Sequence, residues 1–196
     1  MVGARAADGV VLAADRRMSY GYFVASHNVK KVYRLSDSVG VAFAGLPGDM
    51  SGLVRLLRSD LSMYEATTGR KPSVYMTAKR LSIIMYSYKM LPFYVEALIG
   101  GMDPDGSPRL YALDSLGSIT EEDFAAAGSG ATIAYGFLEA NYRKDISVDE
   151  LEKIVVDAAR VALRRDASTG DGIDVLTISK SGVREKTLRL RVALEG

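Results

Sequence analysis

The sequence contains no cysteine and a single histidine, His27, among its 196 residues. The absence of cysteine excludes disulfides, thiolate metal sites and a cysteine nucleophile, and it fits a cytoplasmic protein. One histidine cannot build a multi-histidine metal centre, and a serine–histidine triad would have to use His27. We interpret His27 as a surface or strand residue without a catalytic role, and we expect neither a metal nor a cofactor.

Long apolar runs and an excess of one charge are also absent. No apolar run approaches the roughly 20 residues that a membrane-spanning helix needs, and the N-terminus is too short and too polar for a signal peptide. The chain has 25 Lys and Arg against 24 Asp and Glu, with the two signs interleaved. We therefore expect no membrane association and no nucleic-acid partner, and the length favours one domain over residues 1–196.

The hydrophobic pattern places strands beside strands and helices beside helices along the chain. The order is strands, two helices, strands, two helices, strands, which is typical of an α+β fold. We expect two stacked antiparallel sheets flanked by helix pairs, a four-layer αββα sandwich that would bury every apolar face. The expected strands are 10–14, 23–25, 32–35, 39–44, 94–99, 109–113, 124–127, 173–178 and 183 onward, with alternation continuing over 189–194. The expected helices are 47–69, 73–92, 131–142 and 147–166.

Two short motifs suggest ligand sites but match them poorly. Gly128-Ser129-Gly130 precedes a helix, as a phosphate-binding loop would. However, Ile133 stands where the dinucleotide fingerprint needs its third small residue, and no Gly-Lys-Ser/Thr follows, so we interpret the motif as a tight turn. Asp103 and Asp105 supply too few oxygen ligands for a calcium loop and indicate a plain turn.

Two other polar groups have both a structural and a functional interpretation. Asp15 ends a buried strand, where a carboxylate needs a partner, and Lys31 is a candidate. A lysine held between carboxylates and carbonyls can tune a nearby amine or hydroxyl, although a solvated strand end is the alternative. Residues 166–172 concentrate hydroxyls and carboxylates, as a helix-terminating turn also does.

Six segments, in this order and with matching gaps, resemble β subunits of the 20S proteasome core particle, archaeal in character. They are DGVVLAADRR (8–17), VKKVY (29–33), AGLPGD (44–49), GGMD (100–103), GSG (128–130) and RDASTGDGID (165–174). The resemblance runs from residue 1 to about residue 178. It implies the N-terminal nucleophile hydrolase fold and stacked seven-membered rings, with β rings around a proteolytic chamber and α rings outside. The implied partners are other β subunits, α-ring subunits and unfolded polypeptide substrates.

The resemblance also implies roles for individual residues. In active members of this threonine peptidase family, an N-terminal threonine attacks the peptide carbonyl through its hydroxyl, and its free amine takes part in proton transfer. Asp15 corresponds to the acidic residue that holds the catalytic lysine, and Lys31 to that lysine, which lowers the proton affinity of the threonine. Gly45 corresponds to the glycine whose N–H serves the oxyanion. Ser129 and Asp166 correspond to supporting polar residues near the amine.

The remaining correspondences concern a third supporting residue and the specificity pocket. Thr169 falls where a serine is usual, so that a hydroxyl is kept. The first specificity pocket is implied to be apolar and to be lined by Met18, Val29, Phe43, Pro47 and Ser51.

The nucleophile is where the sequence departs from the family pattern. Met1 falls at the third position of a mature active subunit, and no side chain in residues 1–5 can attack a carbonyl. We therefore expect a catalytically silent β subunit with a structural and assembly role, beside an active β subunit that supplies the threonine. The alternative is an active threonine endopeptidase whose propeptide and first residues are missing from this sequence. A nucleotide-binding module is disfavoured because its motifs fail.

Overall fold

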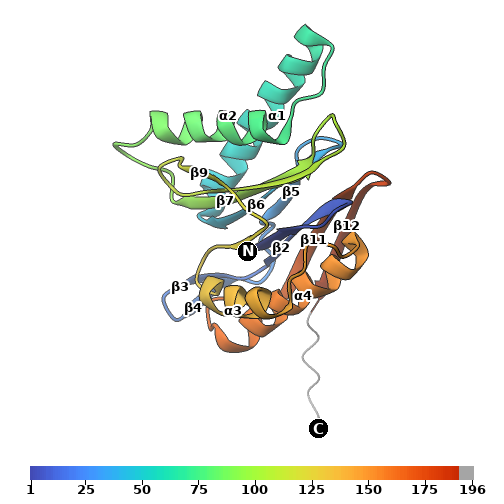
Figure 1. The fold of residues 1–196 in the computed structure, drawn as a ribbon. Helices are drawn as coiled ribbons and strands as arrows, with labels where there is room; N and C mark the ends of the chain where they lie inside the picture. The colour runs from blue at the N-terminus through green and yellow to red at the C-terminus, as the bar shows by residue number, and fades with distance from the viewer. Residues whose placement is uncertain (190–196) are drawn as a thin grey trace.

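Two five-stranded antiparallel sheets face each other in the computed structural model, which describes residues 1–189 (Figure 1). From edge to edge, the first sheet consists of β10 (Phe124–Ala126), β1 (Val2–Arg5), β2 (Gly9–Asp15), β11 (Gly172–Ser179) and β12 (Gly182–Arg189). The second consists of β5 (Val32–Arg34), β6 (Val39–Gly45), β7 (Val95–Met102), β8 (Pro108–Leu113) and β9 (Ile119–Glu121). A separate hairpin pairs β3 (Met18–Tyr20) with β4 (Phe23–Ser26).

A pair of helices covers the outer face of each sheet (Figure 1). The helices α1 (Pro47–Thr68) and α2 (Val74–Ser87) pack on the second sheet. On the first sheet lie α3 (Ala131–Asn141) and α4 (Val148–Arg165). This arrangement is the four-layer αββα sandwich expected from the sequence, and it confirms the α+β fold class.

Local chemistry explains where the helices begin and end. Gly69 ends α1 in the left-handed conformation, with φ of 65°. The Ser73 side chain caps α2, and Ser147 with Glu150 forms a capping box at the start of α4. These caps agree with the sequence pattern, but α2 ends at Ser87, before the stop that we expected at Pro92.

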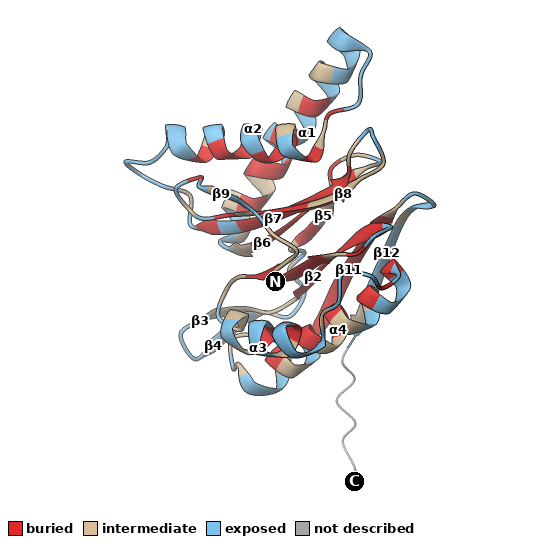
Figure 2. Cartoon of the chain, viewed as in Figure 1, coloured by how far each residue is buried: buried red, intermediate tan, exposed pale blue. Residues whose placement is uncertain are grey.

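Three apolar layers hold the sandwich together (Figure 2). Two of them lie between a sheet and its helix pair, and the third lies between the sheets. Glycine allows the sheets to approach closely. A Cβ on Gly40 would lie 2.3 Å from the Leu176 side chain, and one on Gly100 would lie 2.6 Å from Val10. The β2 strand therefore runs through the middle of the molecule, buried along its whole length.

Most expected elements are present, with ends shifted by a few residues. The strands β1, β3 and β9 were not expected, because each has only three or four residues and too little pattern of its own. They exist because longer neighbours offer backbone partners, as β2 and β10 do for β1. The alternation expected over 189–194 lies, apart from Arg189, outside the described residues. No helix within residues 1–189 is long and apolar enough to cross a membrane.

The packing of α1 can be tested with two leucines of the same helix. Leu53 is fully buried, whereas Leu56 is 49% exposed. Leu53→Ala should lower the free energy of unfolding by about 2–5 kcal/mol, because it leaves a cavity in the helix–sheet layer. Leu56→Ala should change it by less than about 0.5 kcal/mol. Urea denaturation of the isolated chain measures both, and equal losses would contradict the packing described here.

Candidate active site

A pocket of about 750 Å³ opens at the end of the sandwich where β1 begins and β2 ends. Met1 lines it, together with residues from β2, β6 and the turn before α3. Of the site residues inferred from the sequence, Asp15, Lys31, Gly45, Ser129 and Thr169 line this pocket. The fold thus brings together groups that lie more than 150 residues apart in the chain.

An ion pair between Asp15 and Lys31 lies on one side of the pocket. The Lys31 Nζ is 2.8 Å from Asp15 Oδ1, and the two side chains are only 14% and 7% exposed. Asp15 is the last residue of β2, and its Oδ2 accepts N–H groups from Arg17 at 3.0 Å and from Gly170 at 3.3 Å. The backbone therefore satisfies one carboxylate oxygen and the lysine the other, which makes this buried charge tolerable.

A second polar cluster is centred on Asp166, the residue that caps the C-terminus of α4. Its Oδ2 accepts hydrogen bonds from the hydroxyls of Ser129 and Thr169, and its Oδ1 accepts the N–H of Ser168 at 3.1 Å. Burial by itself would raise the pKa of Asp166, but these hydrogen bonds outweigh it and hold the pKa below its ordinary value. The loop therefore both ends α4 and forms a cluster of hydrogen-bonded polar groups.

The backbone of Met1 continues the pairing of β1 with β10 into the pocket. The Met1 amine donates to the Ala127 carbonyl at 2.9 Å, and the Ala127 N–H donates to the Met1 carbonyl at 3.1 Å. Burial lowers the pKa of this amine to about 6, against the attraction of Asp15 and with the repulsion of Lys31. Burial at this position therefore disfavours a positive charge.

Gly45 lies at the end of β6 in a conformation that other residues rarely adopt. Its φ is 135°, and a Cβ there would lie 1.9 Å from the Tyr94 carbonyl oxygen. The Leu46 N–H donates to that same carbonyl at 2.9 Å. The backbone at Gly45 is therefore fixed in place along the pocket wall.

The residues inferred for the specificity pocket divide into two groups. Met18, Phe43 and Pro47 line the pocket. Among the described residues, Val29 and Ser51 are not part of that lining. The Val29 N–H donates to the Arg16 carbonyl at 2.9 Å, and the Ser51 hydroxyl donates to the Gly48 carbonyl at 3.0 Å.

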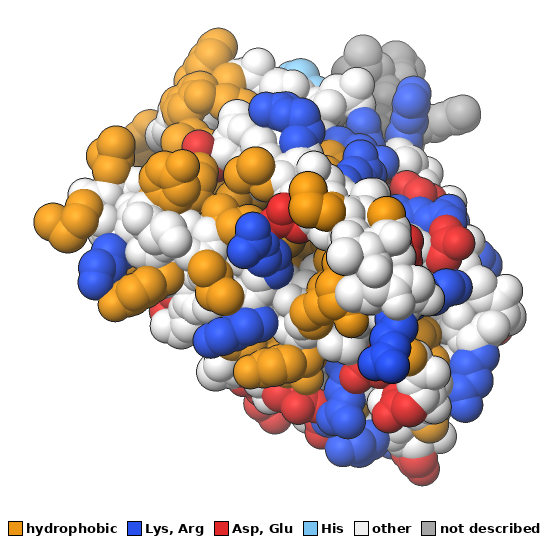
Figure 3. All heavy atoms as spheres, turned by 90° about the horizontal axis from the view of Figure 1, so that it is seen from above, with side chains coloured by type: hydrophobic (Ala, Val, Ile, Leu, Met, Phe, Trp, Pro, Cys, Tyr) orange, Lys and Arg blue, Asp and Glu red, His pale blue; other side chains and the backbone are white. Residues whose placement is uncertain are grey.

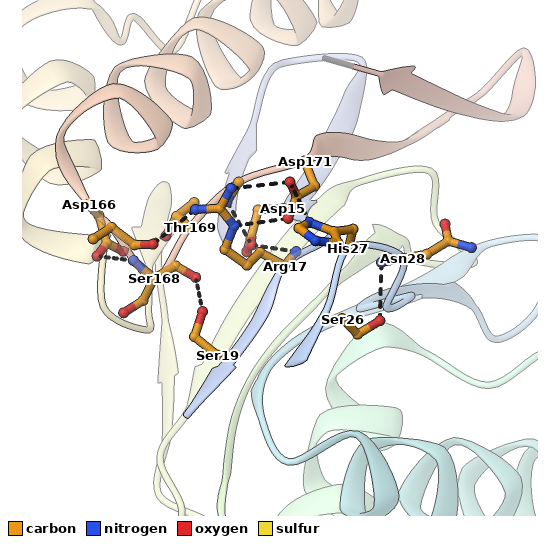
Figure 4. Close-up of polar contacts among 12 residues, drawn as sticks. Asp15, Arg17, Ser19, Ser26, His27, Asn28, Asp166, Ser168, Thr169 and Asp171 are labelled. Atoms are coloured by element: carbon orange, nitrogen blue, oxygen red, sulfur yellow. Dashed lines mark hydrogen bonds and ion pairs between the residues drawn. The ribbon is translucent and has the colours of Figure 1, made fainter. Parts of the chain in front are cut away.

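Several residues of the site were not inferred from the sequence. Glu96 lines the pocket and accepts the Gly128 N–H at 3.0 Å, but in the sequence it is only a polar residue within a strand. Arg17 also lines the pocket and pairs with Asp171 (Figure 4). The side chain of His27 is 68% exposed, and its Nδ1 lies 2.9 Å from Asp171 Oδ1. Residues 1–189 contain no group of His, Cys, Asp or Glu side chains that could hold a metal ion.

The contribution of the Asp15–Lys31 ion pair to stability can be tested by comparing substitutions of Lys31 and of its neighbour Lys30. Lys31→Met leaves the Asp15 carboxylate buried without its cation and should lower the free energy of unfolding by about 3–5 kcal/mol. Lys30 instead pairs with Glu185 at 3.4 Å, with both side chains about half exposed. Lys30→Met should therefore change stability by less than about 1 kcal/mol. Denaturation at neutral pH measures both, and similar losses would contradict a buried pair.

The Asp166 cluster predicts a pH dependence of known sign. Because the pKa of Asp166 is depressed in the folded state, its contribution to stability is complete above the unfolded value of about 3.9 and is lost as the pH falls through the folded value. The stability difference between the wild type and Asp166→Asn should thus shrink from about pH 5 toward pH 3. Ser129→Ala, which removes one donor, should weaken this trend. A difference that grows on acidification would refute the assignment.

Comparisons with known proteins show the family to which this chain belongs. The family model described as "Proteasome subunit" matches residues 1–178. "Proteasome subunit beta 2" of Thermofilum pendens is 46% identical over 96% of this chain and 92% of its own length. "Proteasome subunit beta 1" of Hyperthermus butylicus is 49% identical over 91% and 88%, and "Proteasome subunit beta 2" of Pyrobaculum neutrophilum is 42% identical over 98% and 95%. The chain belongs to the proteasome subunit family, as a β subunit of the archaeal type.

Proposed function

We propose that this chain is a subunit of a seven-membered β ring and carries the polar groups that surround the nucleophile of a threonine-type peptidase site. A form that begins at Met1 has no nucleophile for that site and would have a structural role. The observation that carries the proposal is the Asp15–Lys31 ion pair in the pocket that the start of β1 enters; residues 1–5 include no hydroxyl or thiol. A partner β subunit supplies the threonine for degradation of unfolded polypeptides. We further propose that the assembled particle acts in the cytoplasm.

The roles proposed for the polar groups follow from the chemistry of peptide hydrolysis. A threonine hydroxyl oxygen forms an ester with the carbonyl carbon while the peptide C–N bond breaks and the leaving amine takes a proton; water then hydrolyses the ester. Lys31, held by Asp15, would lower the proton affinity of that hydroxyl. The Gly45 N–H would donate to the oxyanion, and Ser129, Asp166 and Thr169 would surround the amine.

The direction of β1 supports a nucleophile position upstream of Met1. Met1 pairs with Ala127 and lines the pocket, so residues preceding it would continue into the pocket by about 3.3 Å each. A threonine two positions before Met1 would then approach the Asp15–Lys31 pair. The second candidate function is therefore an active endopeptidase, namely a longer form of this chain that begins with such a threonine. The complete ion pair favours it, although the pair also holds the fold together.

The surface supports a role in assembly, as a proteasome subunit requires. Figure 3 shows hydrophobic side chains gathered on one side of the face seen from above. Large apolar residues are exposed along α2 and the segment after it, among them Ile83, Tyr86, Tyr88, Met90 and Leu91. An apolar groove of about 560 Å³ also runs between α1 and α2. Apolar surface of this kind is typical of a protein–protein contact.

Adding the nucleophile back tests the proposal. The chain is co-expressed with its partner subunits, whose own threonines are replaced by alanine, and hydrolysis of fluorogenic peptides by the assembled particle is measured. The printed sequence should give no turnover. A form with a free threonine two positions before Met1 should hydrolyse the peptides, and Lys31→Ala should reduce its kcat by about 10²–10⁴-fold.

An alanine at the same added position serves as the matched control. Turnover by the printed sequence that Lys31→Ala abolishes would contradict a silent chain. If the threonine-led form is as inactive as the alanine-led form, the catalytic roles proposed for the polar groups around the pocket are contradicted.

A further inference from the structure

Arg17 contacts Asp15 through its backbone and the loop of residues 166–171 through its side chain (Figure 4). Its backbone N–H donates to Asp15 Oδ2 at 3.0 Å, on the side of the Lys31 ion pair. Its guanidinium donates to the two carboxylate oxygens of Asp171 at 2.9 and 3.1 Å, and to the Ala167 carbonyl at 3.0 Å. The side chain is 24% exposed, so these charge-assisted bonds are partly shielded from water.

The guanidinium holds the loop of residues 166–171 at both ends. Ala167 and Asp171 bracket the part of the loop that contains Thr169, a donor to Asp166, and Gly170, a donor to Asp15. A Cβ on Gly170 would lie 2.4 Å from the Arg17 guanidinium carbon, so the lack of a side chain there lets the guanidinium lie against the loop backbone. The Arg16 N–H completes the junction by donating to the Gly170 carbonyl at 3.2 Å.

Asp171 has a left-handed backbone conformation, and its side chain is bound by Arg17. Its φ of 69° is the one positive value at a non-glycine residue within residues 1–189. The hydrogen bonds from Arg17, against the opposing effect of burial, hold the pKa of Asp171 below its ordinary value, with a further contribution from His27. The bidentate pair therefore acts on an ionised carboxylate and secures a backbone turn that is otherwise unfavourable.

We propose that the Arg17 side chain is a positioning residue for peptide hydrolysis: by clamping Ala167 and Asp171 it fixes the 166–171 loop against the end of β2. The Asp166 cluster and the Asp15–Lys31 pair are thereby kept in register with each other. Arg17 itself donates no proton to substrate. This inference rests on the proposed function, since its kinetic consequence requires a threonine-led chain.

Arg5 provides a closely matched control. Its Nε is 2.8 Å and its Nη2 2.7 Å from Asp123 Oδ1, its Nη1 donates to the Pro108 carbonyl at 3.3 Å, and its side chain is 18% exposed. Its Nη1 also donates to Glu121 Oε1 at 3.1 Å. Arg5 thus combines carboxylate partners with a backbone carbonyl, as Arg17 does, but it is not part of the pocket lining among the described residues. Lysine at either position keeps the charge and loses the planar set of guanidinium donors.

The kinetic experiment compares Arg17→Lys with Arg5→Lys in the threonine-led assembled particle. Arg17→Lys should lower kcat at least tenfold and leave KM within twofold, because the apolar lining of Met18, Phe43 and Pro47 is unchanged while the reacting groups lose their register. Arg5→Lys should change both constants less than twofold. The inference would be overturned if Arg17→Lys lowers kcat no more than Arg5→Lys does, or if its effect is a rise in KM rather than a fall in kcat. An inactive threonine-led parent would instead count against the proposed function.

A second measurement tests the clamp without any activity. In the printed chain, Arg17→Lys should accelerate hydrogen exchange at the Gly170 and Thr169 amides at least tenfold relative to the wild type, and Arg5→Lys should leave both unchanged. Unchanged exchange in Arg17→Lys would show that the guanidinium does not hold the loop, whatever the kinetics of the threonine-led form.

Discussion

The buried ion pair between Lys31 and Asp15 is the interaction on which the rest of the site depends. A carboxylate that is 7% exposed at the end of a central strand needs a cation and N–H donors, because an unpaired charge there would be strongly destabilising. Those donors come from Arg17 and from Gly170, which is distant in sequence. Satisfying this one carboxylate therefore requires that the end of β2, the start of β5 and the loop after α4 meet.

The sandwich provides the framework that makes this meeting possible. Glycines let the two sheets approach closely, so that β2 and β6 bring Asp15 and Gly45 to one pocket. Pairing of β1 with β2 and β10 then leads the backbone at Met1 into the same pocket. Burial there disfavours a positive charge, and the hydroxyls of Ser129 and Thr169 donate to Asp166. Fold stability and the chemistry of the site thus depend on the same contacts.

The sequence predicts the layers and much of the site, because their signals are strong and local. The apolar run of β2, the capping box at Ser147 and the glycine that ends α1 each have a direct physical meaning. Asp15 and Lys31 could be paired by the argument that a carboxylate at the core boundary needs a cation. Glu96 and the clamp by Arg17 could not be predicted, since Glu96 depends on where the turn before α3 lies, and the clamp depends on how the loop after α4 folds back. The short strands β1, β3 and β9 depend likewise on neighbours rather than on their own pattern.

The central claim is that the polar surround acts only on an N-terminal threonine two positions before Met1. The most direct measurement is intact-mass spectrometry of this subunit from the native assembled particle after treatment with a peptide electrophile that reacts with N-terminal threonine. The account predicts an adduct on every copy whose mass includes that threonine, and none on copies that begin at Met1 or Val2. An adduct on a copy that begins at Met1 or Val2, or threonine-led copies that stay unmodified, would contradict it.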